Sequence, residues 1–462
     1  MSTPYFPQWR RFCAPLGAHT NRAREAAERL SGLAGLFGSY FKDLLVPART
    51  GAGSRRRDFT RVEVFWAFLG QVLIRGGSCR WALARLQIEA IAQGRRRPQD
   101  GTGAYCQARA ALSLAWLESL FAQLNRWLAP RVKDQWWGRT VRLIDGTGFS
   151  MPDTAKNRKR WDYPGGSKPG CGFPAGKLVG LFCLHSGRLL AFVQDTCKTH
   201  DLKLARRLVC WLQPQDVLVA DRAYCGWVFL ALLRRRGADF VIRLHQARCI
   251  QSKRLGSSRE RWTRPQREKA QSWRVWRTLP KELPIRLVRF MVHPRGYRSH
   301  AITVATSLLD SKQFPDSAIA ALYHQRWQVE LHFRQIKTNL SLDVLRGLSP
   351  ALIERELWMH AIVYNLVRAL LMETALTHDV PVDRLSFKGG IDAISAWAQL
   401  PAPSPSRRRH SRRELLSRLA SDQVPLRPGR HEPHAKKRRP KNYQLMTKPR
   451  SAMKVSPSRN LK

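Results

Sequence analysis

The stretch from Thr140 to Leu244 constrains the fold most, because short apolar runs alternate there with segments of helical composition. The runs that we predict as strands cover Thr140 to Phe149, Val179 to His185, Arg188 to Thr196, Asp216 to Asp221 and Asp239 to Leu244. The segments predicted as helices are Asp201 to Leu212 and Cys225 to Arg236. Three strands, a helix, a strand, a helix and a strand can build a mixed sheet covered by helices, so the predicted fold class is α/β.

The region before this stretch, residues 1–135, is predicted to be a helical domain. Helical composition or helical spacing of apolar residues marks Asn21 to Phe41, Phe59 to Ile74 and Cys79 to Ala92. Basic loops at Arg55 to Arg57 and Arg95 to Arg97 separate these pieces. A small basic helical domain can bind DNA, but helices joined by basic loops also occur in basic proteins with other functions.

The α/β core is predicted to span residues 136–345, with a β-rich insertion at about 246–310. The β-type runs of the insertion are Ser272 to Leu279, Ile285 to Val292 and His300 to Leu308. A long helix is predicted to begin at Pro315 to Ser317 and to run to about Leu340. Residues 346–400 form a C-terminal helical region with a helix from Pro350 to Thr377, and residues 401–462 form a basic, flexible tail.

The charge balance points to a polyanionic partner. The chain has 81 Lys and Arg against 33 Asp and Glu, a formal net charge of +48. Such self-repulsion is relieved most easily by nucleic acid, although a merely basic soluble protein is the simpler alternative. The longest apolar stretch, Val62 to Ile74, is shorter than the ~20 residues of a membrane span. The nine cysteines include no CxxC pair, which argues against a zinc finger and fits a reducing cytoplasm.

Two acids close predicted strands. Asp145 follows Leu143 and Ile144, and Asp221 follows Val219 and Ala220. Ligand sites of α/β sheets gather just beyond strand ends, and two close carboxylates repel each other unless protons or cations intervene. Mg²⁺ binds through one or two carboxylates together with substrate phosphates, so a divalent-ion site is one interpretation. The alternative is that each Asp only forms a turn.

The long predicted helix carries a polar row beside its apolar stripe. At ~100° per residue, the polar residues project into one sector about 80° wide. They are Tyr323, Arg326, Glu330, Arg334 and Lys337. The apolar stripe consists of Leu322, Val329, Phe333, Ile336 and Leu340. The polar row is either a functional face or a solvated face with ion pairs at i, i+4 spacing.

These residues resemble a known family in their spacing. Tyr323-x2-Arg326-x3-Glu330-x6-Lys337 is similar to the Tyr-Arg-Glu-Lys signature of DDE transposases from bacterial insertion sequences. Asp145-Gly146-Thr147 and Asp221-Arg222-Ala223-Tyr224 resemble the two aspartate motifs of that family, in the same order. The helix Glu356 to Ala369 is also similar to the stretch that follows the signature, and the resemblance covers roughly residues 60 to 375.

The resemblance implies a ribonuclease-H-like core in which Asp145, Asp221 and Glu330 are both the catalytic residues and the metal ligands. They would coordinate two Mg²⁺ ions, for which Mn²⁺ can substitute. Tyr323, Arg326 and Lys337 would contact DNA phosphates near the cleaved end, which positions DNA without reading its sequence. The implied activity is cut-and-paste transposition, with strand cleavage at terminal inverted repeats and strand transfer into target DNA.

The implied partners are double-stranded DNA, as element ends and as target, and a second copy of the chain in a synaptic dimer. The expected location is the bacterial cytoplasm, associated with the nucleoid, and no membrane partner is expected. The insertion could hold a base flipped out of the DNA, stacked on Trp262, Trp273 or Trp276. Trp273 and Trp276 could equally form a hydrophobic strand face, and His200 is expected to cap a helix.

Two other functions stay open from the sequence. One is a transposase-derived repressor or architectural protein that binds DNA without catalysis, although a protein that only binds does not need three carboxylates. The other is a metal-dependent DNA nuclease that cleaves without joining strands, since both reactions would use the same three acids.

Overall fold

The computed structural model describes residues 32–41, 59–74, 77–92, 94–129, 136–165, 172–246, 248, 254–267, 272–292, 300–399 and 405–425. These residues divide into two compact units, and each is described by itself. The helical unit takes its described residues from Met1–Arg131, Gln335–Leu342 and Ala351–Val424. The sheet unit takes its described residues from Val132–Arg334, Asp343–Pro350 and Pro425–Lys462.

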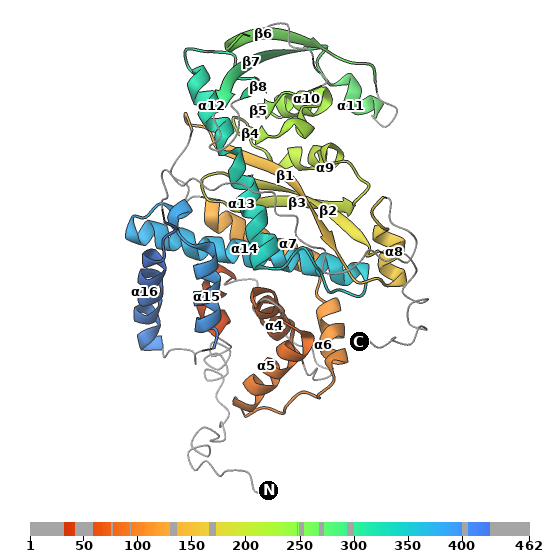
Figure 1. The fold of residues 1–462 in the computed structure, drawn as a ribbon. Helices are drawn as coiled ribbons and strands as arrows, with labels where there is room; N and C mark the ends of the chain where they lie inside the picture. Colours follow the sequence, from red (N-terminus) through yellow and green to blue (C-terminus); the bar gives the residue numbers. More distant parts are fainter. Residues whose placement is uncertain are drawn as a thin grey trace, which may run out of the picture. The chain divides into compact units, whose positions relative to one another are not determined.

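The described part of the sheet unit is built on one 8-stranded sheet, with strands in the order β3-β2-β1-β4-β5-β8-β7-β6 (Figure 1). The strands are β1 (Val141–Ser150), β2 (Ala175–Cys183), β3 (Leu189–Thr196), β4 (Val217–Ala220), β5 (Asp239–Arg243), β6 (Gly256–Thr263), β7 (Glu282–Val292) and β8 (His300–Thr306). β1 pairs antiparallel with β2 and parallel with β4, β2 pairs antiparallel with β3, and β4 pairs parallel with β5. This arrangement from β3 to β5 confirms the predicted ribonuclease-H-like mixed sheet.

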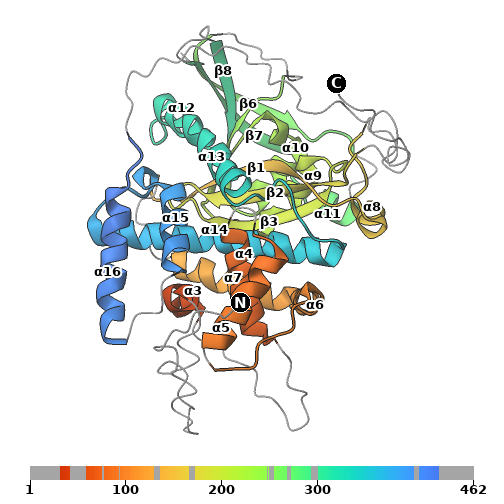
Figure 2. The same cartoon turned by 60° about the horizontal axis from the view of Figure 1, so that its bottom comes forward.

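Helices cover both faces of the sheet, with α9 and α10 on one face and α12 and α13 on the other (Figures 1 and 2). The helical segments are α8 (Ala155–Trp161), α9 (Asp201–Leu208), η3 (Val209–Trp211), η4 (Arg222–Tyr224), α10 (Trp227–Arg235), α11 (Trp273–Arg277), α12 (Asp316–His324), η5 (Gln325–Trp327) and α13 (Gln328–Arg334). Ile144, Ala220 and Ile242 belong to one buried core with Leu204 of α9 and Phe229 of α10. Alternate residues of β1 and β4, including Asp145, therefore point toward the opposite face.

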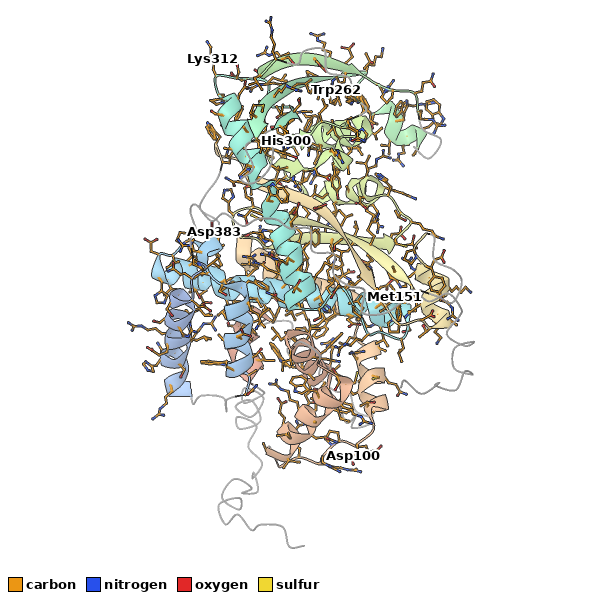
Figure 3. All side chains as sticks on the ribbon, viewed as in Figure 1. Asp100, Met151, Trp262, His300, Lys312 and Asp383 are labelled. Carbon is orange, nitrogen blue, oxygen red and sulfur yellow. The ribbon has the colours of Figure 1, made fainter. Side chains whose placement is uncertain are left out.

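The insertion extends the same sheet. β8 pairs antiparallel with β5, with Ile242 opposite Ala305, and β7 and β6 follow outward. β6 contributes Trp262, labelled in Figure 3, to the core. The expected β-strands are present over β7 and β8, but the predicted β-run Ser272 to Leu279 is wrong, because Trp273–Arg277 is a helix. Trp276 and Leu279 are both buried, and their separation of three residues suits a helix.

The predicted long helix from Pro315 to Leu340 is interrupted. α12 passes through the 3₁₀ turn η5 into α13, and the chain continues in a π-helical turn, η6 (Gln335–Asn339), which belongs to the helical unit. The predicted apolar stripe is buried in every segment. Its members are Leu322, Val329, Phe333, Ile336 and Leu340.

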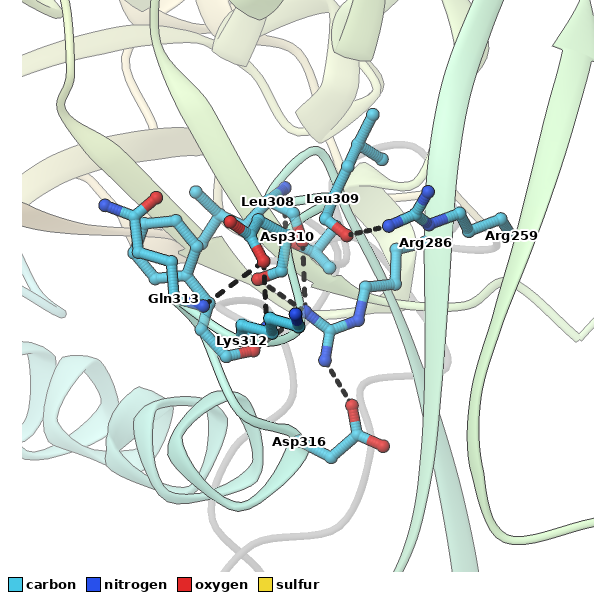
Figure 4. A network of polar contacts seen from close by, with 10 residues as sticks. Arg259, Arg286, Leu308, Leu309, Asp310, Lys312, Gln313 and Asp316 are labelled. Carbon is cyan, nitrogen blue, oxygen red and sulfur yellow. Dashed lines mark hydrogen bonds and ion pairs between the residues drawn. The ribbon is translucent and has the colours of Figure 1, made fainter.

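Arg286 of β7 fixes the loop that leads into α12 (Figure 4). Its Nη1 donates to the carbonyl oxygens of Phe314 at 2.8 Å and Leu308 at 3.2 Å, and its Nη2 pairs with the carboxylate of Asp316. The Arg286 side chain is only 1% exposed, so these contacts satisfy a charge that burial would otherwise disfavour. The inserted strands thereby set where the helix with the predicted polar row begins.

The described residues of the helical unit form helices connected by short segments. These are α3 (Gly32–Phe37), η1 (Gly38–Phe41), α4 (Arg61–Leu73), α5 (Cys79–Ala92), α6 (Thr102–Ala110), α7 (Leu114–Leu128), η6, α14 (Pro350–His378), η7 (Val382–Arg384), α15 (Phe387–Trp397) and α16 (Pro405–Ser421). The helices predicted from Phe59 and Cys79 are confirmed, and Thr60 and Glu63 form a capping box at the start of α4. Of the predicted helix Asn21 to Phe41, residues 21–31 lie outside the described residues.

A polar network joins three helical segments of this unit. Tyr40 of η1 donates to Glu373 of α14 at 2.8 Å, and Arg412 of α16 contacts both carboxylate oxygens of Glu373. Part of the region predicted as a flexible basic tail is therefore helical, because Leu415, Leu416 and Leu419 of α16 are buried, whereas Arg409, Arg413 and Arg418 are exposed. The basic block at Lys436 to Lys441 lies outside the described residues. None of the described helices is long and apolar enough to cross a membrane.

Candidate active site

Asp145 lies inside β1, so the prediction that it closes a strand is wrong, and it is level with Asp221, which directly follows the parallel strand β4 as predicted. Leu143 of β1 is in register with Val219 of β4, and each acid follows two residues later. Asp145 Oδ1 accepts the backbone N–H of Gly146 at 2.8 Å, and Asp221 Oδ1 accepts that of Ala223 at 2.9 Å. Asp221 thus also caps the turn η4, so the turn-forming role and a role in a site are compatible.

Glu330 comes from α13, which packs against β1. Arg326 Nη2 donates to Glu330 Oε1 at 3.0 Å, with side-chain exposures of 13% for Arg326 and 43% for Glu330. The Arg326 guanidinium also lies 4.9 Å from the ring centroid of the exposed Trp327. The ion pair expected at i, i+4 spacing is therefore present, and it is oriented by an aromatic face.

Gly180 lets α13 approach the sheet at the level of Asp145. Gly180 of β2 lies opposite Asp145, and a Cβ atom added there would come within 2.9 Å of the Phe182 ring and 3.3 Å of the Phe333 ring. Phe182 and Phe333 pack edge to face, with ring centroids 5.1 Å apart. The absence of a side chain at position 180 thus allows the helix that carries Glu330 to sit close to β1.

The three acids act on one another electrostatically. Burial, together with the negative charges of Asp221 and Glu330, raises the pKa of the Asp145 carboxyl to about 6. The N–H of Gly146 and the guanidinium of Arg326 lower it. A carboxylate in this setting is stabilised by any added positive charge.

The donor set suits hard divalent ions, because all three side chains are carboxylates. Among the described residues, no group of three His, Cys, Asp or Glu side chains is close enough to enclose a metal ion. The acids form an open arrangement, with Glu330 turned to Arg326. Mg²⁺ commonly takes one or two protein carboxylates and completes its shell with water and phosphate oxygens, so an open carboxylate cluster fits such an ion.

Comparison with known proteins places the chain in a family. The family model described as "Transposase DDE domain" matches residues 136–366, half of the chain, and spans all three acids. The chain belongs to the transposase DDE domain family. It is a DNA transposase, an enzyme that cleaves DNA and transfers strands, and DNA is its partner. The resemblance to DDE transposases of insertion sequences is confirmed, and the Tyr-Arg-Glu-Lys signature stays a prediction.

Relatives named as transposases align with this chain. "Transposase InsG for insertion sequence element IS4" of Escherichia coli (strain K12) is 27% identical over 414 residues, covering 87% of this chain and 90% of the relative. A "probable transposase for insertion sequence element IS5377" of Geobacillus stearothermophilus is 26% identical over 255 residues, covering 54% of this chain and 61% of the relative. A solved piggyBac transposase synaptic complex with hairpin DNA aligns with a TM-score of 0.42 at 9% identity, covering 90% of this chain and 88% of that chain.

The predicted DNA contacts of the transposase occupy different settings. Tyr323 is buried, with only 7% of its surface exposed, and its ring centroid lies 6.4 Å from that of Phe290 in the insertion. Burial raises the pKa of Tyr323, while Arg326 and Arg243 oppose that rise. Lys337 is half-buried in η6 of the helical unit, whereas Arg326 is in the sheet unit beside Glu330.

The three tryptophans of the insertion separate by exposure. Trp262 and Trp276 are each 6% exposed and belong to the core. Trp273 is 56% exposed, with Arg267 and Arg277 placed 4.6 and 5.6 Å from its ring centroid. Of the three, Trp273 is therefore the one whose side chain is exposed. His200 caps α9 as predicted, since its Nδ1 accepts the N–H of Leu202.

Two residues near the acids were not singled out from the sequence. Arg243 ends β5 next to Asp221, and the register of β5 with β4, which the sequence does not give, reveals its place. Tyr224 is 1% exposed, and its hydroxyl has no hydrogen-bond partner among the described residues. Burial raises the pKa of Tyr224 well above its usual range, and Asp145, Asp201 and Asp221 add to the effect.

Proposed function

We propose that this chain is the cut-and-paste transposase of a bacterial insertion sequence, and that divalent ions held by Asp145, Asp221 and Glu330 drive both cleavage and strand transfer. The observation that carries the proposal is the placement of Asp145 level with Asp221 on adjacent parallel strands, with Glu330 on α13, which packs against β1. The charges of Asp221 and Glu330 both contribute to the raised pKa of Asp145. The family match over residues 136–366 spans the segment that holds these acids and supports transposase activity.

The residues around the acids have distinct roles in this proposal. Two Mg²⁺ ions, or Mn²⁺ in their place, would supply activation of water or a 3′-hydroxyl and neutralise charge on the leaving oxygen. Arg326 releases Glu330 and binds a phosphate of the cleaved end, and Lys337 holds a neighbouring phosphate as a compact charge. Tyr323 supports Arg326 from its buried position and orients the phosphate. Trp273 offers its exposed face to an unstacked base.

Recognition and synapsis complete the proposal. The helical region before residue 136 binds the terminal inverted repeats of the element, and a second copy of the chain brings the other end into the synaptic complex. The protein acts in the bacterial cytoplasm, on nucleoid DNA. The formal charge of +48 favours binding that weakens steeply with salt, since each phosphate contact releases condensed counterions.

The test uses purified full-length protein, a labelled element end, Mg²⁺ and a target plasmid. Wild-type protein should yield cut ends and joined products. Asp145→Asn, Asp221→Asn and Glu330→Gln should bind the end and fail at both reactions. Glu118→Gln, which removes an exposed carboxylate of α7, is the matched control and should react normally. Near-normal turnover in any of the three site variants would overturn the assignment.

The same experiment separates the two competing functions. A transposase-derived binding protein would shift the labelled end without cutting it, at any divalent-ion concentration. A nuclease that does not join strands would release cut ends that never appear in the plasmid.

A further inference from the structure

Arg243 stands next to Asp221 in the sheet. Val217 of β4 is in register with Asp239 of β5, and Ala220 is in register with Ile242. The following residues of the two parallel strands are Asp221 and Arg243, and partners in parallel strands point to the same face. Because Asp145 occupies the same level on β1, the three strands present Asp145, Asp221 and Arg243 as one row.

The helix α12, which carries Tyr323 of the predicted Tyr-Arg-Glu-Lys signature, covers this row. α12 packs against β4 and β5, and Tyr323 of that helix lies within electrostatic range of Asp221, Arg326 and Arg243. Two guanidinium groups therefore flank the buried Tyr323, one from α12–α13 and one from the sheet. Of these two arginines, Arg243 lies on the β5 side of the acids.

Among the described residues, the side chain of Arg243 makes no hydrogen bond or ion pair, although it is half-buried. The buried arginines on strands of this sheet are paired with carboxylates: Arg142 with Asp216 and Arg286 with Asp316. A half-buried guanidinium without an anion is unfavourable, and a phosphate diester would satisfy its forked donors.

We propose that Arg243 is a phosphate-binding residue of the active site, which together with Arg326 grips the DNA backbone on the β5 side of the three acids. This inference deepens the proposed function and rests on it for the position of the DNA. The ligand is a backbone phosphate, which belongs either to the element end or to the target duplex. Arg rather than Lys suits the position, because a planar fork can bind two phosphate oxygens at once.

The experiment measures binding without divalent ions, so that the binding step is separated from cleavage. Full-length wild-type, Arg243→Ala, Arg243→Lys and Arg334→Ala proteins are titrated with an element-end duplex across a salt series. Target-duplex capture by the end complex forms a second arm. Arg243→Ala should lose about tenfold in affinity in at least one arm, and its log–log salt slope should fall by about 1. Arg243→Lys should retain part of the slope, and Arg334→Ala, which removes an exposed charge of α13, should resemble wild type.

A methylphosphonate scan tests the contact itself. Neutralising one phosphate at a time should weaken wild-type binding at a particular position, and neutralising that position should have no further effect on Arg243→Ala. Loss of affinity for the element-end duplex assigns the contact to the element end. Loss of affinity in target-duplex capture assigns it to the target. If Arg243→Ala has the same affinity, salt slope and methylphosphonate profile as wild type in both arms, the proposal is wrong. If Arg243→Ala does not fold, the Arg243→Lys slope and the wild-type scan decide the question in its place.

The alternative is that Arg243 only offsets the charge of Asp221. In that case the effect of Arg243→Ala on DNA binding should vanish in an Asp221→Asn background. A phosphate contact requires the effect to persist there. Failure of the proposed function would give a different result. The Asp145→Asn protein would then cleave the element end, whether or not Arg243 contacts a phosphate.

Discussion

Arg326 and Glu330 form an ion pair one helical turn apart, with Nη2 of Arg326 3.0 Å from Oε1 of Glu330. The pair joins a proposed phosphate contact to a proposed metal ligand. In the protein without DNA, Arg326 and Glu330 therefore neutralise each other. The pair keeps Arg326 from a phosphate and Glu330 from a cation. A phosphate that takes Arg326 would free Glu330 for a cation, so DNA binding and ion binding are expected to reinforce each other.

The Arg326→Ala variant should separate these two effects. Without Arg326, Glu330 loses its counter-charge, so Mn²⁺ should bind the DNA-free protein about 2- to 5-fold more tightly, the range expected for an exposed pair of up to about 1 kcal/mol. The same variant should bind the cleaved end more weakly. Electron paramagnetic resonance of free Mn²⁺ and a gel-shift titration measure the two quantities. Arg334→Ala serves as the control, and a decrease in both affinities would contradict the exchange.

Asp145 should make the stability of the metal-free protein depend on pH. Its pKa is raised from 3.8 to about 6 in the folded protein, mainly by burial, so the folded state holds a proton that the unfolded state has released between these values. Stability therefore falls as the pH rises through this window, and the loss is complete above it. Asp145→Asn should be more stable than wild type at pH 7.5, by about 1 to 3 kcal/mol. The difference should vanish near pH 4.

Thermal denaturation in buffer with chelator measures this difference. Adding Mg²⁺ at pH 7.5 should raise the melting temperature of wild-type protein more than that of Asp145→Asn, since only wild type keeps the charge. Asp100→Asn, at a side chain that is 73% exposed, is the control. Equal melting temperatures for wild type and Asp145→Asn at pH 7.5 would show that the carboxylate is not destabilised by burial.

Arg286 should be essential for the junction between the insertion and α12. Its buried guanidinium is held by Phe314, Leu308 and Asp316, and Arg286→Met would leave the Asp316 carboxylate and these carbonyl groups without their donor. Because the Asp316 side chain is 36% exposed, the main cost comes from the carbonyl groups left without a donor, and it should be about 1 to 3 kcal/mol. Arg259, whose Nη2 donates to Leu309 O at 3.2 Å from an exposed position, provides the matched variant. Arg259→Met should change stability by about 0.5 kcal/mol or less. Urea denaturation followed by tryptophan fluorescence compares the two, and similar midpoints would refute the role of Arg286.

The sequence predicts those helices and strands whose conformation follows from the local spacing of apolar residues. The strand that ends at Asp221 was predictable because Leu218, Val219 and Ala220 are apolar on both faces, as a central parallel strand requires. The run around Trp273 was not, since its apolar spacing is short enough to fit either a strand or a helix. The packing of Trp276 near Trp227, with ring centroids 6.3 Å apart, decides for the helix.

Contacts between distant residues explain what the sequence could not supply. Arg243 is significant only because β5 pairs in register with β4, and no local feature of its strand reveals that pairing. Tyr323 fits the polar row on an ideal helix, yet the interruption at η5 and the neighbouring Phe290 leave it buried. The resemblance to a family provided the three acids, and only the fold shows that Glu330 is turned toward Arg326.

Tyr224 and Tyr40 offer a matched pair of hydroxyl deletions. The Tyr224 hydroxyl is buried without a hydrogen-bond partner among the described residues, so Tyr224→Phe should leave the metal-free protein unchanged or stabilise it by about 1 kcal/mol. The Tyr40 hydroxyl donates to Glu373 and accepts from Arg412, so Tyr40→Phe should destabilise by about 1 to 2 kcal/mol. Thermal denaturation of both variants beside wild type gives the signs. A clear loss of stability in Tyr224→Phe would mean that its hydroxyl is satisfied within the fold.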